Sequence, residues 1–390
     1  MDDSYVPRDL ADSLRRLAGW FPIVSVAGPR QSGKSTLVRA VFGSYAYVNL
    51  EDPATRKAAQ VDPTGFLHAH PAPLVVDEAQ RAPDLFSALQ VASDERGSAG
   101  QYVLSGSQNF LMSRGIGQSL AGRVGLTTLL PFSYAEALRA RPGLSADEFA
   151  LGGGYPRLVK TGMPASVFHA SYIDTYLERD VKGALDVRNL SSFRVFLQLC
   201  AQRVGGILNV SGLARDAGVS FATAKSWLSV LQASSIVYLL APWAANEGKR
   251  LIKAPKLYFL DSGLLCHLLR IRTLQDLLQS VHFGAIVENL VVAETLKRHL
   301  HRAEVPELYY YRDDSKREID LIDATDAASR CAVEVKSGET YRDRFSVQLE
   351  RVGSELGFGP ERRLVVYRGA ETFSSPTCRV VALEEYLAGE

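Results

Sequence analysis

The 390-residue sequence contains only four cysteines, and no two of them form a CxxC pair. This scarcity argues against a disulfide framework or a cysteine-based zinc site. The chain also lacks a long apolar run, a repeat or a low-complexity tract, so neither a membrane span nor a solenoid is expected. The first residues, MDDSYVPRDLADSLRR, are acidic and polar, unlike a signal peptide. We therefore expect a cytoplasmic protein without a membrane partner.

Charge is unevenly distributed although the whole chain has a net charge of only +1. Residues 1–150 carry a net charge of −1, and residues 281–390 carry −5. Residues 151–280 carry +7, from 15 Lys and Arg against 8 Asp and Glu. A basic middle segment favours a polyanion partner. The alternative is a chance excess on solvated helices, and charge alone does not separate the two.

A glycine-rich loop near the N-terminus has the pattern GxxxxGK[ST]. The apolar strand at residues 23–26 leads into GPRQSGKS, and an apolar-periodic helix follows from Thr36. Strand, loop and helix in this order predict a P-loop, whose backbone amides bind ATP phosphates at the helix N-terminus. Lys34 would reach the β- and γ-phosphates, and the Ser35 hydroxyl would bind Mg²⁺. The expected nucleotide-binding residues are Gly28, Arg30, Gln31, Ser32, Gly33, Lys34, Ser35 and Thr36.

Two later strands end in polar residues suited to the same site. PLVVDEAQ delivers Asp77 and Glu78, as a Walker B strand does, so Asp77 would bind Mg²⁺ and Glu78 would polarise the attacking water. GQYVLSGSQNF places Ser107 where a sensor residue would lie beside the γ-phosphate. Arg123 follows in a small-residue turn, and it is either a sensor or arginine finger or a surface residue that pairs with a helix C-terminus.

These blocks resemble a known family when they are read together. GPRQSGKST, PLVVDEAQ, LSGSQNFLM, SLAGRV, PFSYAEAL, GGGYPRLV and YIDTYLERDV occur in this order. Over nearly its full length the chain resembles the prokaryotic AAA-type ATPases with a C-terminal DUF4143 domain. The resemblance implies a P-loop core, ATP binding and assembly into a homo-oligomeric ring, a hexamer. It transfers well to Gly33, Lys34, Ser35, Asp77 and Glu78, and weakly to Arg123.

The middle segment predicts a helix-turn-helix followed by a wing. Ser211 is the expected N-cap of a short helix to Asp216, and a second helix is expected at residues 221–233. The strands IVYLLAPW and KLYFLD would form the wing. DNA contacts would come from Thr223, Lys225 and Ser226 on the helix and from Lys249, Arg250, Lys253 and Lys256 in the wing. The alternative is a packing or oligomerisation module.

The last third contains acids in the order of the PD-(D/E)xK nuclease fold, which it resembles. Glu288 lies on an amphipathic helix, Asp320 on a strand, and Glu334-x-Lys336 on the next strand. Asp320 and Glu334 would share one Mg²⁺, with Lys336 positioning water, and Gln348 would follow on a helix. The alternative is a structural ion pair. Fold likeness does not establish cleavage.

The predicted architecture is α/β: a P-loop AAA-type ATPase at residues 1–150, a helical and winged-helix basic region at 151–275, and a nuclease-like α/β domain at 276–390. The predicted function is ATP-driven DNA remodelling or translocation, with or without Mg²⁺-dependent cleavage, on DNA chosen by structure rather than sequence. The alternative is a nucleotide-gated switch that binds a protein partner and has a silent nuclease-like domain.

Overall fold

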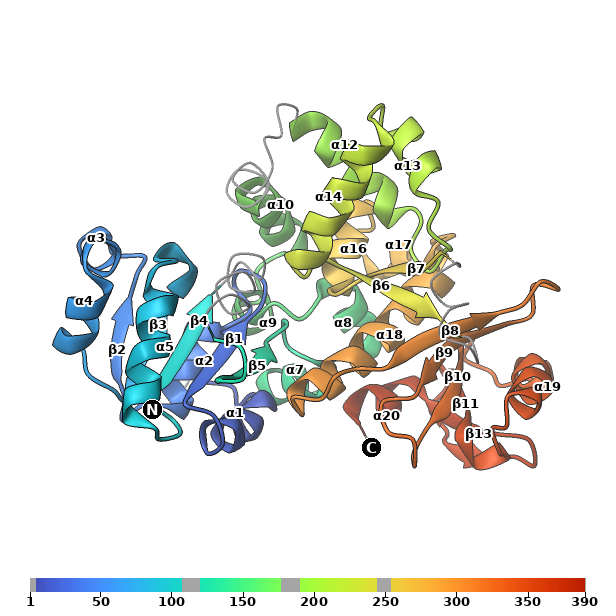
Figure 1. Cartoon of the computed structure of the whole chain (residues 1–390). Helices are drawn as coiled ribbons and strands as arrows, with labels where there is room; N and C mark the ends of the chain where they lie inside the picture. The colour runs from blue at the N-terminus through green and yellow to red at the C-terminus, as the bar shows by residue number, and fades with distance from the viewer. Residues whose placement is uncertain (1–4, 107–119, 177–189, 244–253, 390) are drawn as a thin grey trace. The chain divides into compact units, whose positions relative to one another are not determined.

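The computed structural model describes residues 5–106, 120–176, 190–243 and 254–389 (Figure 1). The chain divides into two compact units. The first unit comprises Met1–Pro131, Ala233–Ser235 and Leu300–Ala303, and the second comprises Phe132–Gln232, Ile236–His299 and Glu304–Glu390. The expected division into three domains stays a prediction.

The first unit is built on a five-stranded parallel sheet with the order β2-β3-β4-β1-β5 (Figure 1). Its strands are β1 (Ile23–Ala27), β2 (Ala46–Asn49), β3 (Leu74–Asp77), β4 (Tyr102–Gly106) and β5 (Val124–Thr128). Its helices are α1 (Leu10–Ala18), α2 (Lys34–Val41), α3 (Pro53–Val61), α4 (Pro63–Ala69), the 3₁₀ turn η1 (Ala79–Arg81) and α5 (Leu85–Arg96). The predicted α/β fold is confirmed.

Both faces of this sheet are covered, which explains the continuous apolar runs of its strands. Leu74 and Val76 of β3 pack in the core that includes α3, α4 and α5. Val75, between them, faces the opposite core with α1 and α2. Because parallel strands end at the same edge, the residues that follow β1 and β3 gather there.

The second unit contains an eight-stranded mixed sheet with the order β12-β13-β11-β10-β9-β8-β6-β7. Its strands are β6 (Val237–Pro242), β7 (Lys256–Phe259), β8 (Leu308–Arg312), β9 (Glu318–Asp323), β10 (Cys331–Lys336), β11 (Arg363–Tyr367), β12 (Phe373–Ser374) and β13 (Arg379–Ala382). Helix α19 (Val347–Glu355) packs on β9, β10 and β11 through Leu349 and Val352 (Figure 1). This sheet therefore has its own hydrophobic core.

Further helices surround this sheet in the second unit. They are α7 (Tyr134–Ala140), α8 (Ala146–Gly152), α9 (Pro156–Thr161), α10 (Ala165–Tyr176), α12 (Leu190–Ala201), α13 (Val210–Asp216), α14 (Phe221–Ala233), α16 (Ser262–Leu268), α17 (Leu274–Gln279), α18 (Phe283–His301) and α20 (Leu383–Ala388), with short turns η3 (Asp343–Phe345) and η4 (Pro360–Arg362). The Asn289 side chain of α18 binds both the amide and the carbonyl of Phe259, which ties α18 to β7. None of the described helices is long and apolar enough to cross a membrane.

The predicted helix-turn-helix is present as α13 and α14, with one cap corrected. The Asn209 side chain, not that of Ser211, caps α13 by accepting the Gly212 amide at 2.9 Å. Ser220 caps α14 by accepting the Thr223 amide. Asn209 precedes the helix and so has the extended backbone that a cap requires, whereas Ser211 lies within the first turn.

The expected wing strands form a hairpin that belongs to the large sheet. β6 pairs antiparallel with β7, and β6 also pairs parallel with β8. A free strand edge leaves backbone groups unpaired, and the pairing of Ala241 with Tyr309 and of Pro242 with Tyr310 avoids this at the end of β6. The hairpin is therefore the edge of the eight-stranded sheet, and the winged-helix assignment stays a prediction.

The second unit contains a histidine that is buried and, in the described part of the chain, has no charged partner in hydrogen-bonding contact. His169 of α10 is fully buried, and its Nε2 lies 3.1 Å from the Gly152 carbonyl oxygen. Its Nδ1 has no hydrogen-bond partner among the described residues. Burial lowers the pKa of His169, although the charge of Asp261 opposes this effect. The imidazole is therefore neutral in the folded chain.

We predict that the second unit loses stability as the pH falls through the unfolded-state pKa of histidine, about 6.5. Below that pH the unfolded chain binds a proton that the folded chain excludes, so protonation favours unfolding. Thermal unfolding followed by circular dichroism between pH 8 and pH 5 measures this loss. His169→Phe should remove part of the pH dependence. The exposed His68→Phe should not, and equal pH curves for wild type and His169→Phe would contradict the prediction.

Candidate functional site

The predicted P-loop lies between β1 and α2 at the carboxyl edge of the parallel sheet. Gly28 adopts φ +150°, and a Cβ there would lie 2.1 Å from the Leu129 carbonyl oxygen, so the close approach of two backbones requires glycine. Gly33 has φ +93° and directly precedes α2. The loop therefore turns sharply into the helix N-terminus, where amides are available to an anion.

The residues of this loop fit a nucleotide. Lys34 is 6% exposed, and its ammonium donates to the carbonyl oxygens of Gly28 and Pro29 at 3.0 and 2.7 Å. The Ser32 hydroxyl is buried without a hydrogen-bond partner in the described part of the chain. A phosphate would supply an acceptor for both groups, whereas carbonyl oxygens are weaker partners for an ammonium. Ser35 and Thr36 follow Lys34 in the first turn of α2.

The Walker B acids lie at the end of β3 at the same edge, where Asp77 is the last residue of the strand and Glu78 follows it. Asp77 is paired in register with Ser105 of β4, whose hydroxyl donates to the Asp77 carboxylate. The Tyr47 hydroxyl of β2 donates to the other Asp77 oxygen at 2.6 Å. Burial, with Asp77 as a further cause, raises the pKa of Tyr47 to about 12. These neighbouring strands fix the orientation of Asp77, which is suited to Mg²⁺ bound with nucleotide.

The backbone at Glu78 leaves the extended conformation of β3 directly after Asp77. Glu78 adopts φ +58°, uncommon for a residue with a side chain, and its carboxylate accepts from the Gln80 side chain at 2.6 Å. Such strained positions concentrate at functional sites. A carboxylate held here can orient and polarise a water molecule that attacks the γ-phosphate.

Arg8 is a residue of this site that sequence reasoning missed. It precedes α1, is 5% exposed, and donates to the Ser32 carbonyl at 2.7 Å and the Leu130 carbonyl at 2.8 Å. Its guanidinium thus links the P-loop to the chain after β5. A lone arginine near the N-terminus carries no motif, so only the fold reveals its role.

Two other residues, Ser107 and Arg123, are expected near the nucleotide. Ser107 lies outside the described residues. Arg123 forms a two-pronged ion pair with Asp94 near the C-terminal end of α5, at 2.6 and 2.8 Å. This is the arrangement expected of a surface arginine, and a role as sensor or arginine finger stays a prediction.

The acids of the nuclease-like segment lie in the second unit with two lysines. Lys256 is 2% exposed, and its Nζ lies 2.9 Å from Glu288 and 2.5 Å from Glu318. The Tyr258 hydroxyl donates to Glu288 at 2.6 Å. Burial, reinforced by Asp320, raises the pKa of Glu288 to about 7. The expectation that Lys256 lies in an exposed wing loop and contacts DNA is therefore wrong, because it begins the buried strand β7.

The other half of this cluster is the VEVK strand. Glu334 is 8% exposed, and Lys336 donates to its Oε1 at 2.6 Å. Glu334 Oε2 has no hydrogen-bond partner among the described residues. Burial and the charge of Asp320 raise the pKa of Glu334 to about 8. Asp320 accepts the Val335 amide at 2.8 Å, and burial raises its pKa as well.

These acids form a charged cluster but not a preformed metal site. Among the described residues, no choice of one oxygen from each of Glu288, Asp320 and Glu334 brings all three within 4.8 Å of one another. The unpaired Oε2 of Glu334 is suited to binding a cation, but the oxygens of the three acids are not grouped closely enough to hold one ion together. Gln348 is exposed on α19. The Mg²⁺ expected here stays a prediction.

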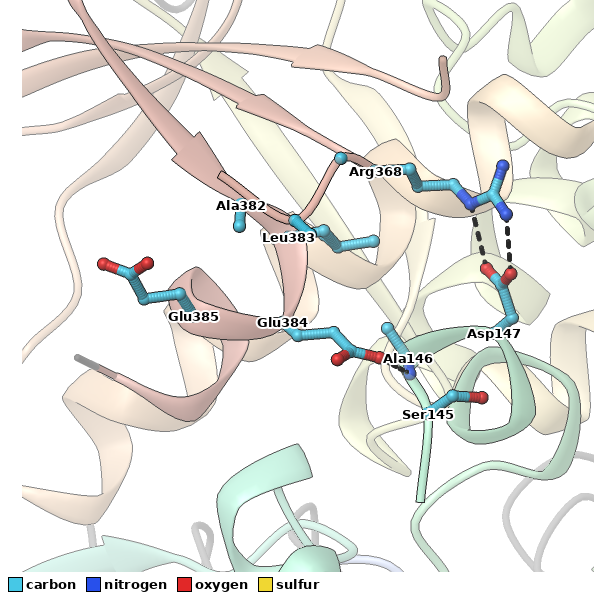
Figure 2. A pocket seen from close by; sticks show the side chains of 10 residues that line it. Ser145, Ala146, Asp147, Arg368, Ala382, Leu383, Glu384 and Glu385 are labelled. Atoms are coloured by element: carbon cyan, nitrogen blue, oxygen red, sulfur yellow. Dashed lines mark hydrogen bonds and ion pairs between the residues drawn. The ribbon is translucent and has the colours of Figure 1, made fainter. Parts of the chain in front are cut away.

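A cavity of ≈330 Å³ lies elsewhere in the second unit, between α8 and α20 (Figure 2). Arg368 donates to the two carboxylate oxygens of Asp147 at 3.1 and 2.8 Å. Figure 2 shows these two side chains facing one another, while Glu385 points away from them. Glu384 accepts the Ala146 amide at 2.9 Å. Two charged groups of the cavity lining, Arg368 and Asp147, therefore neutralise one another, and Glu384 is bound by a backbone amide.

The expected DNA-binding residues of α14 are accessible. Lys225 and Ser226 are exposed, whereas Thr223 is half-buried and its hydroxyl is hydrogen-bonded to Ser220. Arg215 on α13 is also exposed. Lys249, Arg250 and Lys253 lie outside the described residues. DNA contact by any of them stays a prediction.

The fold and the carboxyl-edge site define a P-loop ATPase, since P-loop, Walker B acids and parallel sheet occur together as ATP binding requires. An AAA domain family matches residues 21–138. Two domains of unknown function, DUF8612 and DUF4143, match residues 144–275 and 283–386.

Two relatives are similar to almost the whole chain. The uncharacterized proteins Mb2031c of Mycobacterium bovis and Rv2008c of Mycobacterium tuberculosis are each 36% identical over 374 residues, which is 94% of this chain and 81% of theirs. The chain belongs to their family, the AAA-type ATPases with a C-terminal DUF4143 domain.

Solved structures give more distant likenesses. The Walker-type ATPase PABY2304 of Pyrococcus abyssi has a TM-score of 0.45 and 14% identity, covering 67% of this chain and 94% of that one. A signal-transduction ATPase with a tetratricopeptide repeat sensor, PH0952 of Pyrococcus horikoshii, has a TM-score of 0.29 and 12% identity, covering 76% of this chain and 46% of that one.

We predict that Arg8→Ala weakens ATP binding by about tenfold or more, because the variant lacks two charge-assisted hydrogen bonds that hold the loop. Titration calorimetry with ATP measures the affinity, and steady-state kinetics separate KM from kcat. Arg8→Lys should restore only part of the affinity, since an ammonium lacks the planar fork. The exposed Arg15→Ala on α1 is the matched control. An unchanged affinity in Arg8→Ala would refute this positioning role.

Proposed function

We propose that this chain is an ATPase that binds DNA through its basic helical region and uses ATP hydrolysis to remodel or move along that DNA. The observation that carries the proposal is the charge of +7 over residues 151–280, together with the exposed Lys225 and Ser226 of α14. Phosphate contacts of this kind supply affinity without sequence readout, so preference would follow DNA structure. Mg²⁺ is the proposed metal of the nucleotide site.

We further propose that the ATPase assembles as a homo-oligomeric ring, a hexamer, in which a neighbour completes the nucleotide site. Arg123 would contact the nucleotide of a neighbouring subunit only after its ion pair with Asp94 breaks. Mass measurement with and without ATP tests the assembly. A monomer under both conditions would contradict it.

The second candidate function is a nucleotide-gated switch that binds a protein partner. The ion pairs of Lys256 with Glu288 and of Lys336 with Glu334 favour the switch. Carboxylates that are already neutralised by lysines are poor metal ligands, so the nuclease-like domain would be catalytically inactive. A switch would hydrolyse ATP slowly whatever DNA is present, and its partner affinity would depend on the nucleotide.

Steady-state ATP hydrolysis with single-stranded, duplex, forked and four-way-junction DNA distinguishes the two. A DNA processor should be stimulated by at least one DNA, and a switch by none. Lys34→Ala should abolish hydrolysis under every condition, which assigns the activity to this site. The same DNAs report cleavage in Mg²⁺, and any cleavage that survives Lys336→Ala would come from another site.

We predict that Lys225→Glu weakens duplex binding and lowers the slope of log affinity against log salt by about 0.9 for each phosphate that the variant no longer neutralises. Fluorescence anisotropy over a salt series measures both quantities. Lys57→Glu on α3 makes the same charge change at another exposed position and should have little effect. An equal weakening in both variants would mean that total charge, rather than α14, determines binding.

A further inference from the structure

The acid cluster of the second unit is neutralised by side chains of the chain itself. Four acids and two lysines gather from three strands and one helix: Glu288, Glu318, Asp320, Glu334, Lys256 and Lys336. Arg312 adds a third cation, 3.1 Å from Glu318. Buried acids at this density require cations, because the repulsion between unpaired carboxylates is strong in a medium of low polarity.

Lys256 occupies the centre of this arrangement. Its ammonium joins Glu288 of α18 to Glu318 of β9, and it lies 5.6 Å from the centre of the Tyr310 ring. Opposing the effect of burial, the charges of Glu288, Asp320 and Glu318 raise the pKa of Lys256. The ammonium therefore stays charged and binds where α18, β7 and β9 meet.

Glu334 remains incompletely paired. Lys336 satisfies one of its oxygens, while Oε2 is buried and without a hydrogen-bond partner among the described residues. Lys256 and Tyr258 both bind the same oxygen of Glu288, Oε1, whereas the two oxygens of Glu334 differ, one paired with Lys336 and one available as a ligand atom. A divalent cation entering the cluster could use this oxygen, but the Lys256 ammonium beside Glu288 would repel it.

We propose that Lys256 is the resident cation of this cluster: its ammonium takes the place of a divalent metal ion between α18 and the sheet, and its removal creates a divalent-cation site with Glu334 as a ligand. The wild-type cluster then needs no metal to be stable. This inference is independent of whether the chain binds DNA or a protein partner.

The test is Mn²⁺ binding to the full, nucleotide-free chain, measured by titration calorimetry and by the shift of the thermal unfolding midpoint. Lys256→Met should bind Mn²⁺ at least about tenfold more tightly than wild type, because one positive charge within hydrogen-bonding distance of the acids is removed. Its midpoint should rise with Mn²⁺ concentration, as expected for a ligand that binds only the folded state. Lys256→Gln keeps a hydrogen-bond donor without the charge and serves if the Met variant does not fold.

Two controls locate the new site. Adding Glu334→Gln to Lys256→Gln should abolish the gain in Mn²⁺ affinity, and Lys225→Met, which removes an exposed lysine, should produce no gain. The proposal is overturned if folded Lys256 variants bind Mn²⁺ no better than wild type. It is also overturned if wild type already binds Mn²⁺ tightly and Glu334→Gln abolishes that binding, an outcome that can be observed even if no Lys256 variant folds.

Discussion

Burial of a charged side chain is costly unless a partner replaces the water it loses, and this constraint shapes both charged centres of the molecule. In the first unit the Lys34 ammonium is held by the carbonyl oxygens of Gly28 and Pro29. In the second unit the Lys256 ammonium is held by Glu288 and Glu318. The two lysines differ in how readily they could turn to a ligand, because an ammonium binds neutral carbonyl oxygens more weakly than carboxylates.

The two centres therefore differ in their readiness for a ligand. At the P-loop, a buried Ser32 hydroxyl and a weakly held ammonium stand at a helix N-terminus, where a phosphate would satisfy both. In the acid cluster, by contrast, Lys256 and Lys336 already neutralise carboxylates, and one buried oxygen of Glu334 has no hydrogen-bond partner among the described residues. A nucleotide site with an unsatisfied buried hydroxyl and an acid cluster that is neutralised by lysines are both consistent with either DNA or a protein as the partner of this ATPase.

The eight-stranded sheet links features that are distant in sequence. The β6–β7 hairpin continues the sheet that holds β9 and β10, so the strand pair that follows the helix-turn-helix also carries Lys256 into the acid cluster. Helix α18 contributes Glu288 and is fastened to β7 through Asn289. The acid cluster and the hairpin that follows α14 therefore share one residue, Lys256.

The sequence was sufficient to predict the P-loop, the Walker B acids, the α/β class and helix α14, because each depends on local spacing and on apolar periodicity that survives in any context. It was also sufficient to select Glu288, Asp320, Glu334 and Lys336 as one group. It was not sufficient for Arg8, Tyr47 or the burial of Lys256, since these depend on which strands become neighbours. From the sequence alone, a lysine before LYFL is expected to be exposed to solvent. In the fold, β7 lies beside β6 and α18, and the buried Lys256 ammonium is stabilised there by two carboxylates.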